Sequence, residues 1–172
     1  PEAFNILVMG PWSHGDWARD RSTQMVGNIV FGEKISEFYQ REIEAPFFRH
    51  FLKDTGQPPK FEALVFDTGR KTWDAFAEWP PQDAKTEKFY LRSDERLSLK
   101  PTDSEDGEAT EYLSDPNEPV PYSEDIKIVF TPRKYMTDDQ RFAERRPDVI
   151  EFQTEPLPED LTLAGELRAQ LF

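Results

Sequence analysis

The fold is decided by the stretch LVMGPWSHGDW, residues 7–17, near the start of the chain. Its first residues belong to an apolar run, residues 4–9, which is nearly continuous and ends at a glycine-proline pair. Such a run is typical of a strand covered on both faces, as in a parallel sheet between helices. The stretch therefore predicts a buried strand that leads directly into a turn carrying His14, one of 2 histidines in the chain.

An amphipathic helix is predicted beyond this turn, over residues 35–52. Apolar residues recur there at spacings of three, four and one, which gives the helix a broad aromatic face. Pro46 lies inside the pattern and removes one backbone donor, so we expect a kink or a second helix there. Gly56 and the prolines after it end the helix. Residues 15–34 are polar and contain glycine, and no regular element is assigned to them.

From Phe61 onward the sequence is typical of β-structure. Short runs rich in β-branched and aromatic residues recur roughly every 10 to 15 residues, with prolines mostly between them. These runs are FEALVFDTG, EKFYLRSDERLSL, ATEYLSDP, IKIVFTP, DVIEFQTEPL and LAGELRAQLF. A lone strand before residue 60 cannot satisfy its own backbone donors and acceptors. We therefore divide the chain into residues 1–60, the end of an α/β domain, and residues 61–172, a β-domain.

Composition excludes several classes of partner. The formal net charge of −13 and the pI near 4.6 argue against nucleic acid and anionic membranes, whose charges would repel this chain. No apolar run is long enough to span a bilayer, and the absence of cysteine excludes disulfides and thiolate metal sites. The acidic, proline-rich residues 100–121 predict a solvated loop, with a calcium site as the minor alternative. The sequence thus predicts no metal, no cofactor, no nucleic acid partner and no membrane partner.

His14 is a candidate for acid-base chemistry because of where it lies. α/β sheets place their active sites outside the carboxyl ends of their strands, and an imidazole titrates near neutral pH. In α/β-hydrolases the triad runs Ser, then Asp or Glu, then His. The chain contains no G-x-S-x-G, so this interpretation places the nucleophile and the acid upstream of Pro1. The pattern alone leaves open the alternative that His14 is a structural loop residue.

Several uncommon motifs occur in a recognisable order. They are LVMGPWSHG, the segment of residues 45–81 that ends in W-x₅-WPP, YLSDPNEPVPY, and residues 135–172 with DQR and RPDVI. In this order they resemble the histidine loop, the closing helix with its following strand and connector, and the C-terminal jelly roll of one family. That family is the cocaine esterase and X-Pro dipeptidyl-peptidase family of serine hydrolases. Within it the likeness is to α-amino acid ester hydrolases and glutaryl 7-aminocephalosporanic acid acylases.

The resemblance implies a fold and a mechanism. The fold is an α/β-hydrolase remnant of one strand plus the closing helix, followed by a β-sandwich jelly roll, truncated at both ends. The resemblance makes His14 the general acid/base of a Ser-Asp-His triad whose other members lie upstream of Pro1. The triad would attack an ester or amide carbonyl through an acyl-enzyme. We expect the substrates to be α-amino acid esters or β-lactam-type acyl compounds, and this part of the enzyme to be inactive alone.

The resemblance also bears on partners and on location. It implies a small-molecule ester or amide substrate, needs no cofactor, and leaves a homo-oligomer open. The family is bacterial in this interpretation and includes exported members. A periplasmic or secreted location is therefore one alternative, and the absence of cysteine is compatible with either side of the membrane.

Two residues near the predicted site, and the second histidine, are further candidates for a role. Trp12 can line the substrate pocket, or it can pack to fix its Gly-Pro turn. Asp16 can orient His14, but it lies only two residues away and the chain order of the triad favours an earlier acid. His50 is interpreted as a capping or packing residue near the end of the helix.

A binding protein is the alternative to the enzyme. In this hypothesis the jelly roll is a non-catalytic module for carbohydrate or a protein partner, and Trp73 and Trp79 form a platform for sugar stacking. The competing interpretation places both tryptophans in packing at a domain interface. Residues 138–148, DDQRFAERRPD, predict a corner between strands that is held by salt bridges rather than a ligand site.

Overall fold

The computed structural model describes residues 3–19, 23–101, 109–125, 135 and 137–171. The chain forms two compact units, which are described separately. The first contains Pro1–Asp83, Thr131–Asp138 and Gly165–Phe172, and the second contains Ala84–Phe130 and Asp139–Ala164.

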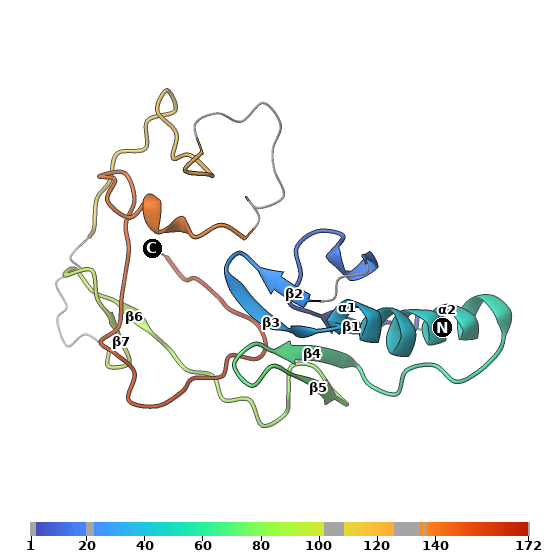
Figure 1. The fold of residues 1–172 in the computed structure, drawn as a ribbon. Helices are drawn as coiled ribbons and strands as arrows, with labels where there is room; N and C mark the ends of the chain where they lie inside the picture. The colour runs from blue at the N-terminus through green and yellow to red at the C-terminus, as the bar shows by residue number, and fades with distance from the viewer. Residues whose placement is uncertain (1–2, 20–22, 102–108, 126–134, 136, 172) are drawn as a thin grey trace. The chain divides into compact units, whose positions relative to one another are not determined.

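A three-stranded sheet is the centre of the first unit. Its order is β1 (Leu7–Met9), β4 (Ala63–Asp67) and β5 (Thr72–Phe76), with β1 parallel to β4 and β4 antiparallel to β5. The predicted first strand is confirmed, but it is an edge strand, and Met9 is 54% exposed rather than covered on both faces. Parallel strands need a long crossover connection. Here a hairpin and a helix supply it (Figure 1).

The hairpin lies in the stretch to which the sequence assigned no element. Strands β2 (Thr23–Val26) and β3 (Ile29–Glu33) pair antiparallel, with Val26 opposite Ile29. The two residues between them are Gly27, at a φ of 57°, and Asn28. A glycine with positive φ at the first central position suits a type II′ turn, whose twist matches the twist of the strands. The sequence signal for this hairpin, which the sequence analysis missed, is Gly27-Asn28 between the apolar residues 25–26 and 29–30.

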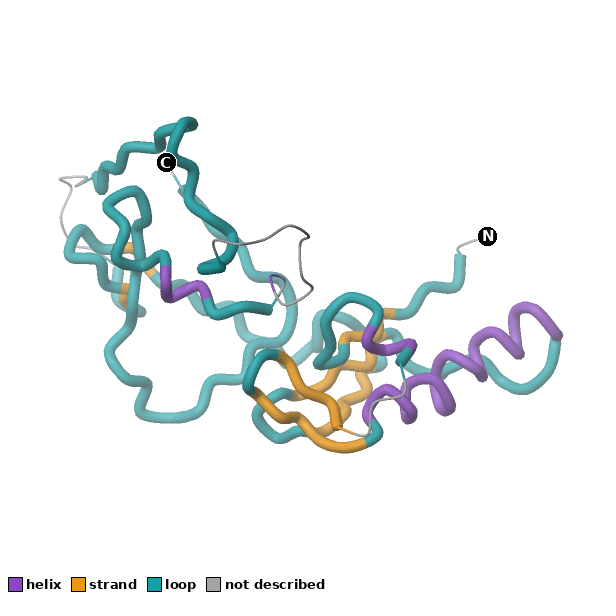
Figure 2. Tube along the Cα trace, turned by 45° about the horizontal axis from the view of Figure 1, so that its top comes forward, coloured by secondary structure: helices purple, strands orange, loops and turns teal. Residues whose placement is uncertain are grey.

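One continuous helical rod follows the hairpin (Figure 2). It consists of α1 (Ile35–Phe38), a π-helical segment (Tyr39–Glu44) and α2 (Ala45–Lys53). The N–H of Ala45 donates to the carbonyl of Gln40, five residues earlier, directly before Pro46. A proline ring crowds the carbonyl four residues before it, so a wider turn relieves that clash. The predicted second helix at Pro46 is confirmed.

The core of the first unit is small and aromatic. Phe31, Ile35 and Phe66 are buried and come from β3, α1 and β4. Trp12 and Trp73 are half-buried and pack against them, which joins the turn after β1 to the sheet. The core therefore lies where the hairpin, the helix and the sheet meet, next to the turn that carries the candidate histidine.

The second unit contains less regular structure. Strands β6 (Tyr90–Leu91) and β7 (Leu97–Ser98) form a hairpin, and Arg96 makes a single parallel bridge to Gln153. The N–H of Leu97 donates to the carbonyl of Gln153 at 2.9 Å, and the N–H of Gln153 donates to the carbonyl of Glu95 at 3.0 Å. These hydrogen bonds join the segment around Gln153 to the hairpin of β6 and β7.

Most of the later strands expected from the sequence do not form. Within the described residues, ATEYLSDP and LAGELRAQLF contain no strand, and DVIEFQTEPL contains only the bridge at Gln153. The run IKIVFTP lies outside the described residues. A strand exists only when a neighbouring strand pairs with its backbone. A high β-propensity alone therefore does not make these runs strands, because each of them also needs a pairing partner.

The sheet also crosses the boundary expected at residue 60. β4 and β5 belong to the predicted second domain, yet they pair with β1 from the predicted first domain. The compact units divide the chain near residue 83 instead. A change from helix to strand in the sequence marks a boundary between elements, whereas strand pairing shows which sheet a strand joins.

Candidate histidine loop

The candidate site is the loop that follows β1 and carries His14. The imidazole is exposed, just beyond the carboxyl end of a strand that has a parallel neighbour. The loop continues into a short 3-10 helix, Asp16–Ala18. In the described part of the chain, the imidazole contacts the indole of Trp17, with ring centroids 5.8 Å apart and planes at 81°. The ring is therefore supported on one side and open to solvent.

Asp16 is buried and binds two residues of its own loop. It is 3% exposed. Its carboxylate accepts a hydrogen bond from Ser13 Oγ at 2.5 Å and another from Arg19 Nη1 at 3.3 Å. A buried carboxylate needs such partners to offset the loss of its hydration. These contacts place Asp16 between the two sides of the turn, which agrees with the sequence argument against it as the triad acid.

Trp12 packs inside the first unit. Its ring centroid lies 5.2 Å from that of Tyr39, 5.8 Å from that of Trp73 and 6.4 Å from that of Trp17. It also lies over Gly10, where a Cβ would come within 2.3 Å of the indole. The packing interpretation of Trp12 accounts for these contacts. Its role in a substrate pocket stays a prediction.

Two side chains of the π-helical segment contact the histidine loop. Tyr39 packs on Trp12, and Gln40 Nε2 donates to the carbonyl of Trp17 at 2.8 Å. Burial raises the pKa of Tyr39, and the nearby carboxylate of Glu44 raises it further, so the phenol stays neutral at physiological pH. The sequence offered no signal for Gln40, because a single polar residue on an amphipathic helix is ordinarily solvated.

The other residues singled out from the sequence lie elsewhere. Trp73 is in the core, with its ring 5.3 Å from Phe66 and 5.8 Å from Phe38. Trp79 packs on Phe76 with ring centroids 5.3 Å apart. His50 Nδ1 lies 3.4 Å from the carbonyl of Gly56, just past the end of α2, which agrees with the predicted capping position. None of these contacts forms a stacking platform for a ligand.

The salt bridges predicted for residues 138–148 are present in the second unit, but within the described residues no strand flanks this corner. Arg141 pairs with Asp139, and Arg146 pairs with Asp148 at 2.6 Å. Arg146 also donates to the carbonyl of Glu118 at 3.2 Å, which holds a distant part of the chain against the corner.

Among the described residues, no helix is both long and apolar enough to cross a membrane.

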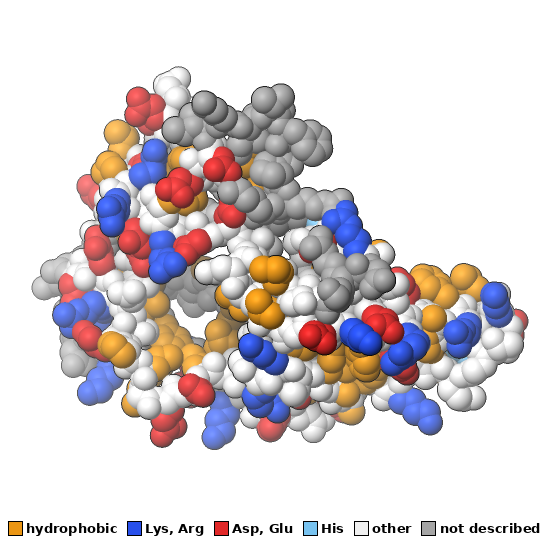
Figure 3. Space-filling model, in the orientation of Figure 1, with side chains coloured by type: hydrophobic (Ala, Val, Ile, Leu, Met, Phe, Trp, Pro, Cys, Tyr) orange, Lys and Arg blue, Asp and Glu red, His pale blue; other side chains and the backbone are white. Residues whose placement is uncertain are grey.

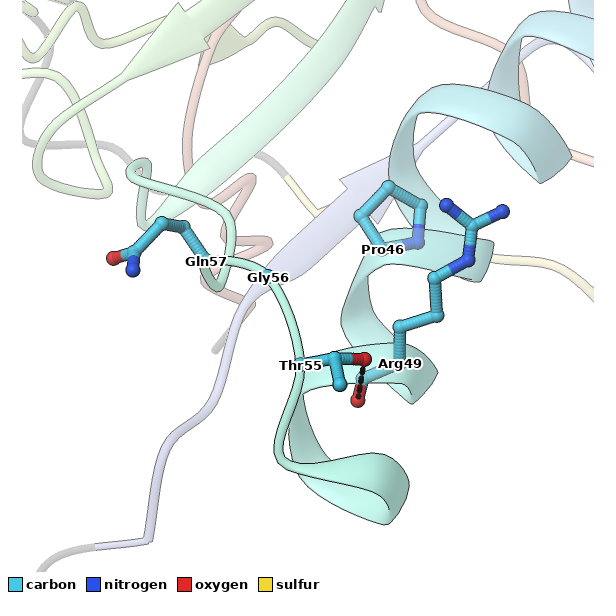
Figure 4. A pocket seen from close by; sticks show the side chains of 5 residues that line it. All are labelled: Pro46, Arg49, Thr55, Gly56 and Gln57. Atoms are coloured by element: carbon cyan, nitrogen blue, oxygen red, sulfur yellow. Dashed lines mark hydrogen bonds between the residues drawn. The ribbon is translucent and has the colours of Figure 1, made fainter.

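A shallow hollow of about 300 Å³ lies at the end of α2 and contains none of the candidate residues. It is lined by Pro46, Arg49, Thr55, Gly56 and Gln57. Thr55 Oγ1 donates to the carbonyl of Arg49 at 3.4 Å, and the side chain of Gln57 points away from the others (Figure 4). This contact closes the last turn of the helix, so the hollow is a feature of a helix end.

The comparisons with known proteins point to one class, the esterases and peptidases. The chain is 29% identical over 177 residues to cocaine esterase of Rhodococcus sp. (strain MB1 Bresler), a match that covers 96% of this chain. Two solved structures are also similar. One is an aminopeptidase of a marine sediment Thaumarchaeota archaeon (31% identity, TM-score 0.74, 90% of this chain), and the other is an α-amino acid ester hydrolase (32%, 0.71, 94%).

The family follows from a further match. Residues 48–172 match the X-Pro dipeptidyl-peptidase C-terminal non-catalytic domain. The chain belongs to the cocaine esterase and X-Pro dipeptidyl-peptidase-like family. It spans 30% of the length of the esterase and 26% and 27% of the two solved chains. His14 lies before the matched domain, in the part of the chain that only the longer relatives cover.

Proposed function

We propose that this chain is the C-terminal part of a serine hydrolase that cleaves esters or amides, with His14 as the general acid/base. The observation that carries the proposal is an exposed imidazole at the carboxyl end of a strand with a parallel neighbour. α/β enzymes place their chemistry at this edge. The serine and the acid of the triad belong to the part of the longer relatives that this chain does not span. The chain alone therefore lacks the groups for turnover.

The α/β remnant in this proposal is larger than one strand and a helix. It includes the crossover from β1 to β4 and ends after β5, near residue 83, where the compact units divide. Residues from 84 onward are then the jelly-roll part. In the described residues β1 pairs only with β4, so its other edge offers backbone groups to a further strand. The preceding strand of the hydrolase sheet is the partner that this edge fits.

An uncovered apolar face supports the same assignment. α2 buries none of its residues, and Phe48, Phe51 and Leu52 are 50%, 43% and 74% exposed. Phe4, just before β1, packs on Phe51 with ring centroids 5.0 Å apart and is itself 46% exposed. Figure 3 shows hydrophobic side chains at the surface over this helix. An apolar face of this kind marks an interface, and the remainder of the α/β domain is the partner that we propose.

The substrate proposal comes from the names of the relatives. They are an esterase, an aminopeptidase and an α-amino acid ester hydrolase. All three names describe attack on an acyl carbon, so we propose small-molecule esters or amides of α-amino acids as substrates. In this chemistry His14 takes the proton of the serine hydroxyl and returns it to the leaving alcohol or amine.

The test uses the full-length hydrolase that contains this sequence. Removing a triad histidine costs on the order of a million-fold in turnover, so His14→Ala is expected to lower kcat by at least about a thousandfold. His50→Ala is the matched control, because His50 lies at the end of α2 and takes no part in the proposed mechanism. Circular dichroism of each variant checks that the fold is kept. A loss smaller than about tenfold in a folded His14→Ala variant would remove His14 from the triad.

Among the described residues, no specific contact supports the binding-module alternative. Trp73 lies in the aromatic core, and Trp79 packs on Phe76 of the preceding strand. A sugar-stacking platform needs an accessible ring face. We therefore propose the serine hydrolase rather than the binding module.

A further inference from the structure

The geometry points to Gln40 as a positioning residue for His14, acting through Trp17. This inference rests on the proposed function, since it names what holds the proposed acid/base in place. Gln40 does not contact the imidazole and is not a catalytic residue. It fixes the residue against which the imidazole lies.

Two contacts make the connection. Gln40 Nε2 donates to the carbonyl of Trp17 at 2.8 Å, across 23 positions in the sequence. The indole of Trp17 then meets the imidazole of His14 in a T-shaped contact, with centroids 5.8 Å apart. An aromatic pair in this geometry has a preferred orientation, so it restricts how the imidazole turns. Fixing the Trp17 backbone therefore fixes one side of the histidine.

Among the described residues, the ring contact of the imidazole is with Trp17. His14 is exposed, and Asp16 uses its carboxylate on Ser13 and Arg19. The hydrogen bond from Gln40 ties this part of the loop to the helical rod rather than to the loop itself. A general base must stay within hydrogen-bonding reach of the proton that it removes, and an error of about 1 Å can cost a hundredfold in rate.

The π-helical winding explains how the side chain of Gln40 reaches the carbonyl of Trp17. Gln40 lies in the π-helical segment, and its carbonyl accepts the five-residue hydrogen bond from Ala45. Pro46 follows directly and forces the wider turn. π-helical turns often occur at functional sites, because they change the direction of individual side chains. Here the turn brings both Tyr39 and Gln40 against the histidine loop.

The test is the proton NMR spectrum of the 172-residue chain, in which only His14 and His50 give imidazole signals. The ring of Trp17 displaces the His14 signals from their positions in an unstructured peptide. Gln40→Met keeps the length of the side chain but removes the donor. It is expected to move the His14 signals toward the unstructured positions and to leave the His50 signals in place. Gln40→Lys restores a donor of similar reach and is expected to return the His14 signals toward their original positions.

Two further variants complete the design. Trp17→Leu removes the indole and is expected to displace the His14 signals in the same direction as Gln40→Met. Gln170→Met makes the same substitution at an exposed position and is expected to change neither histidine. The inference is overturned if Gln40→Met leaves His14 unchanged, if it moves His14 and His50 together, or if Gln40→Lys behaves like Gln40→Met.

A kinetic measurement in the full-length hydrolase separates this inference from the proposed function. Gln40→Met is expected to lower kcat by about tenfold to a hundredfold with little change in KM, because orientation and not substrate binding is lost. If His14→Ala leaves turnover intact, the proposed function fails, whereas the NMR result still decides whether Gln40 orients the imidazole. An unchanged kcat in Gln40→Met, beside a His14→Ala variant that is inactive, overturns the positioning role alone.

Discussion

At the scale of single residues, the histidine loop is shaped by Gly10 and Trp12. The indole folds back over the glycine, and it also touches Tyr39 and Trp73. Any side chain at position 10 would occupy the place of the ring. The glycine is therefore needed for close approach, and the indole joins the start of the loop to the core.

Gly10→Ala tests this close approach. The added Cβ would lie 2.3 Å from the Trp12 ring, so the indole must move and part of its packing is lost. We expect the free energy of unfolding to fall by about 1–3 kcal/mol, as in other overpacked sites. Gly69→Ala is the control, since its Cβ would meet the nearest atom, Asp67 Oδ1, at 3.4 Å. Urea denaturation measures both variants, and equal losses would show that the indole does not depend on Gly10.

At the scale of elements, the second unit has short strands, and ion pairs between side chains hold its loops. Asp139 begins the 3-10 helix Gln140–Phe142 by accepting a hydrogen bond from the N–H of Arg141 at 3.0 Å. The Arg141 guanidinium also binds this carboxylate, with Nε 2.9 Å from Oδ1. The element is thus held by one carboxylate and one arginine.

This bridge gives the helix a defined response to pH. The side-chain hydrogen bond from Arg141, followed by its backbone N–H, lowers the pKa of Asp139 from 3.8 to about 2. Because the folded pKa is the lower one, the contribution of Asp139 to stability is present above the ordinary pKa and is lost as the pH falls toward about 2. In Arg141→Gln the pKa is expected to rise toward its ordinary value. NMR titration of the Asp139 carboxyl measures it, and an unchanged pKa contradicts the assignment to Arg141.

At the scale of the first unit, aromatic contacts join its parts. Trp73 on β5 touches Trp12 from the loop, Phe38 from the helix and Phe66 from β4. One ring therefore contacts the histidine loop, the helix α1 and the strand β4. Trp79, by contrast, has its ring contact with Phe76 on the preceding strand.

Trp73→Ala is expected to destabilise the chain more than Trp79→Ala. Truncating a large aromatic core residue costs about 3–5 kcal/mol, and Trp73 is half-buried, so a loss of about 3 kcal/mol is expected. Trp79→Ala is expected to cost about 1 kcal/mol, because it removes one ring pair. Thermal unfolding followed by circular dichroism compares the two. A larger loss for Trp79 would mean that the aromatic core does not hold the unit together.

Local patterns in the sequence determined the first strand, the long amphipathic helix, the break at Pro46 and the turn with His14, because each depends on neighbouring residues. The family likeness was equally visible in the order of the motifs. The hairpin of β2 and β3 was missed although Gly27-Asn28 is a recognised turn pair.

Only the tertiary structure decided which strands pair and what surrounds the histidine. β4 joins β1 in parallel, several β-like runs stay unpaired within the described residues, and Gln40 reaches Trp17 across 23 positions. The physical reason is common to all three. A backbone or side-chain donor is satisfied by whichever acceptor the folded chain brings within about 3 Å, and sequence periodicity carries no record of that distance.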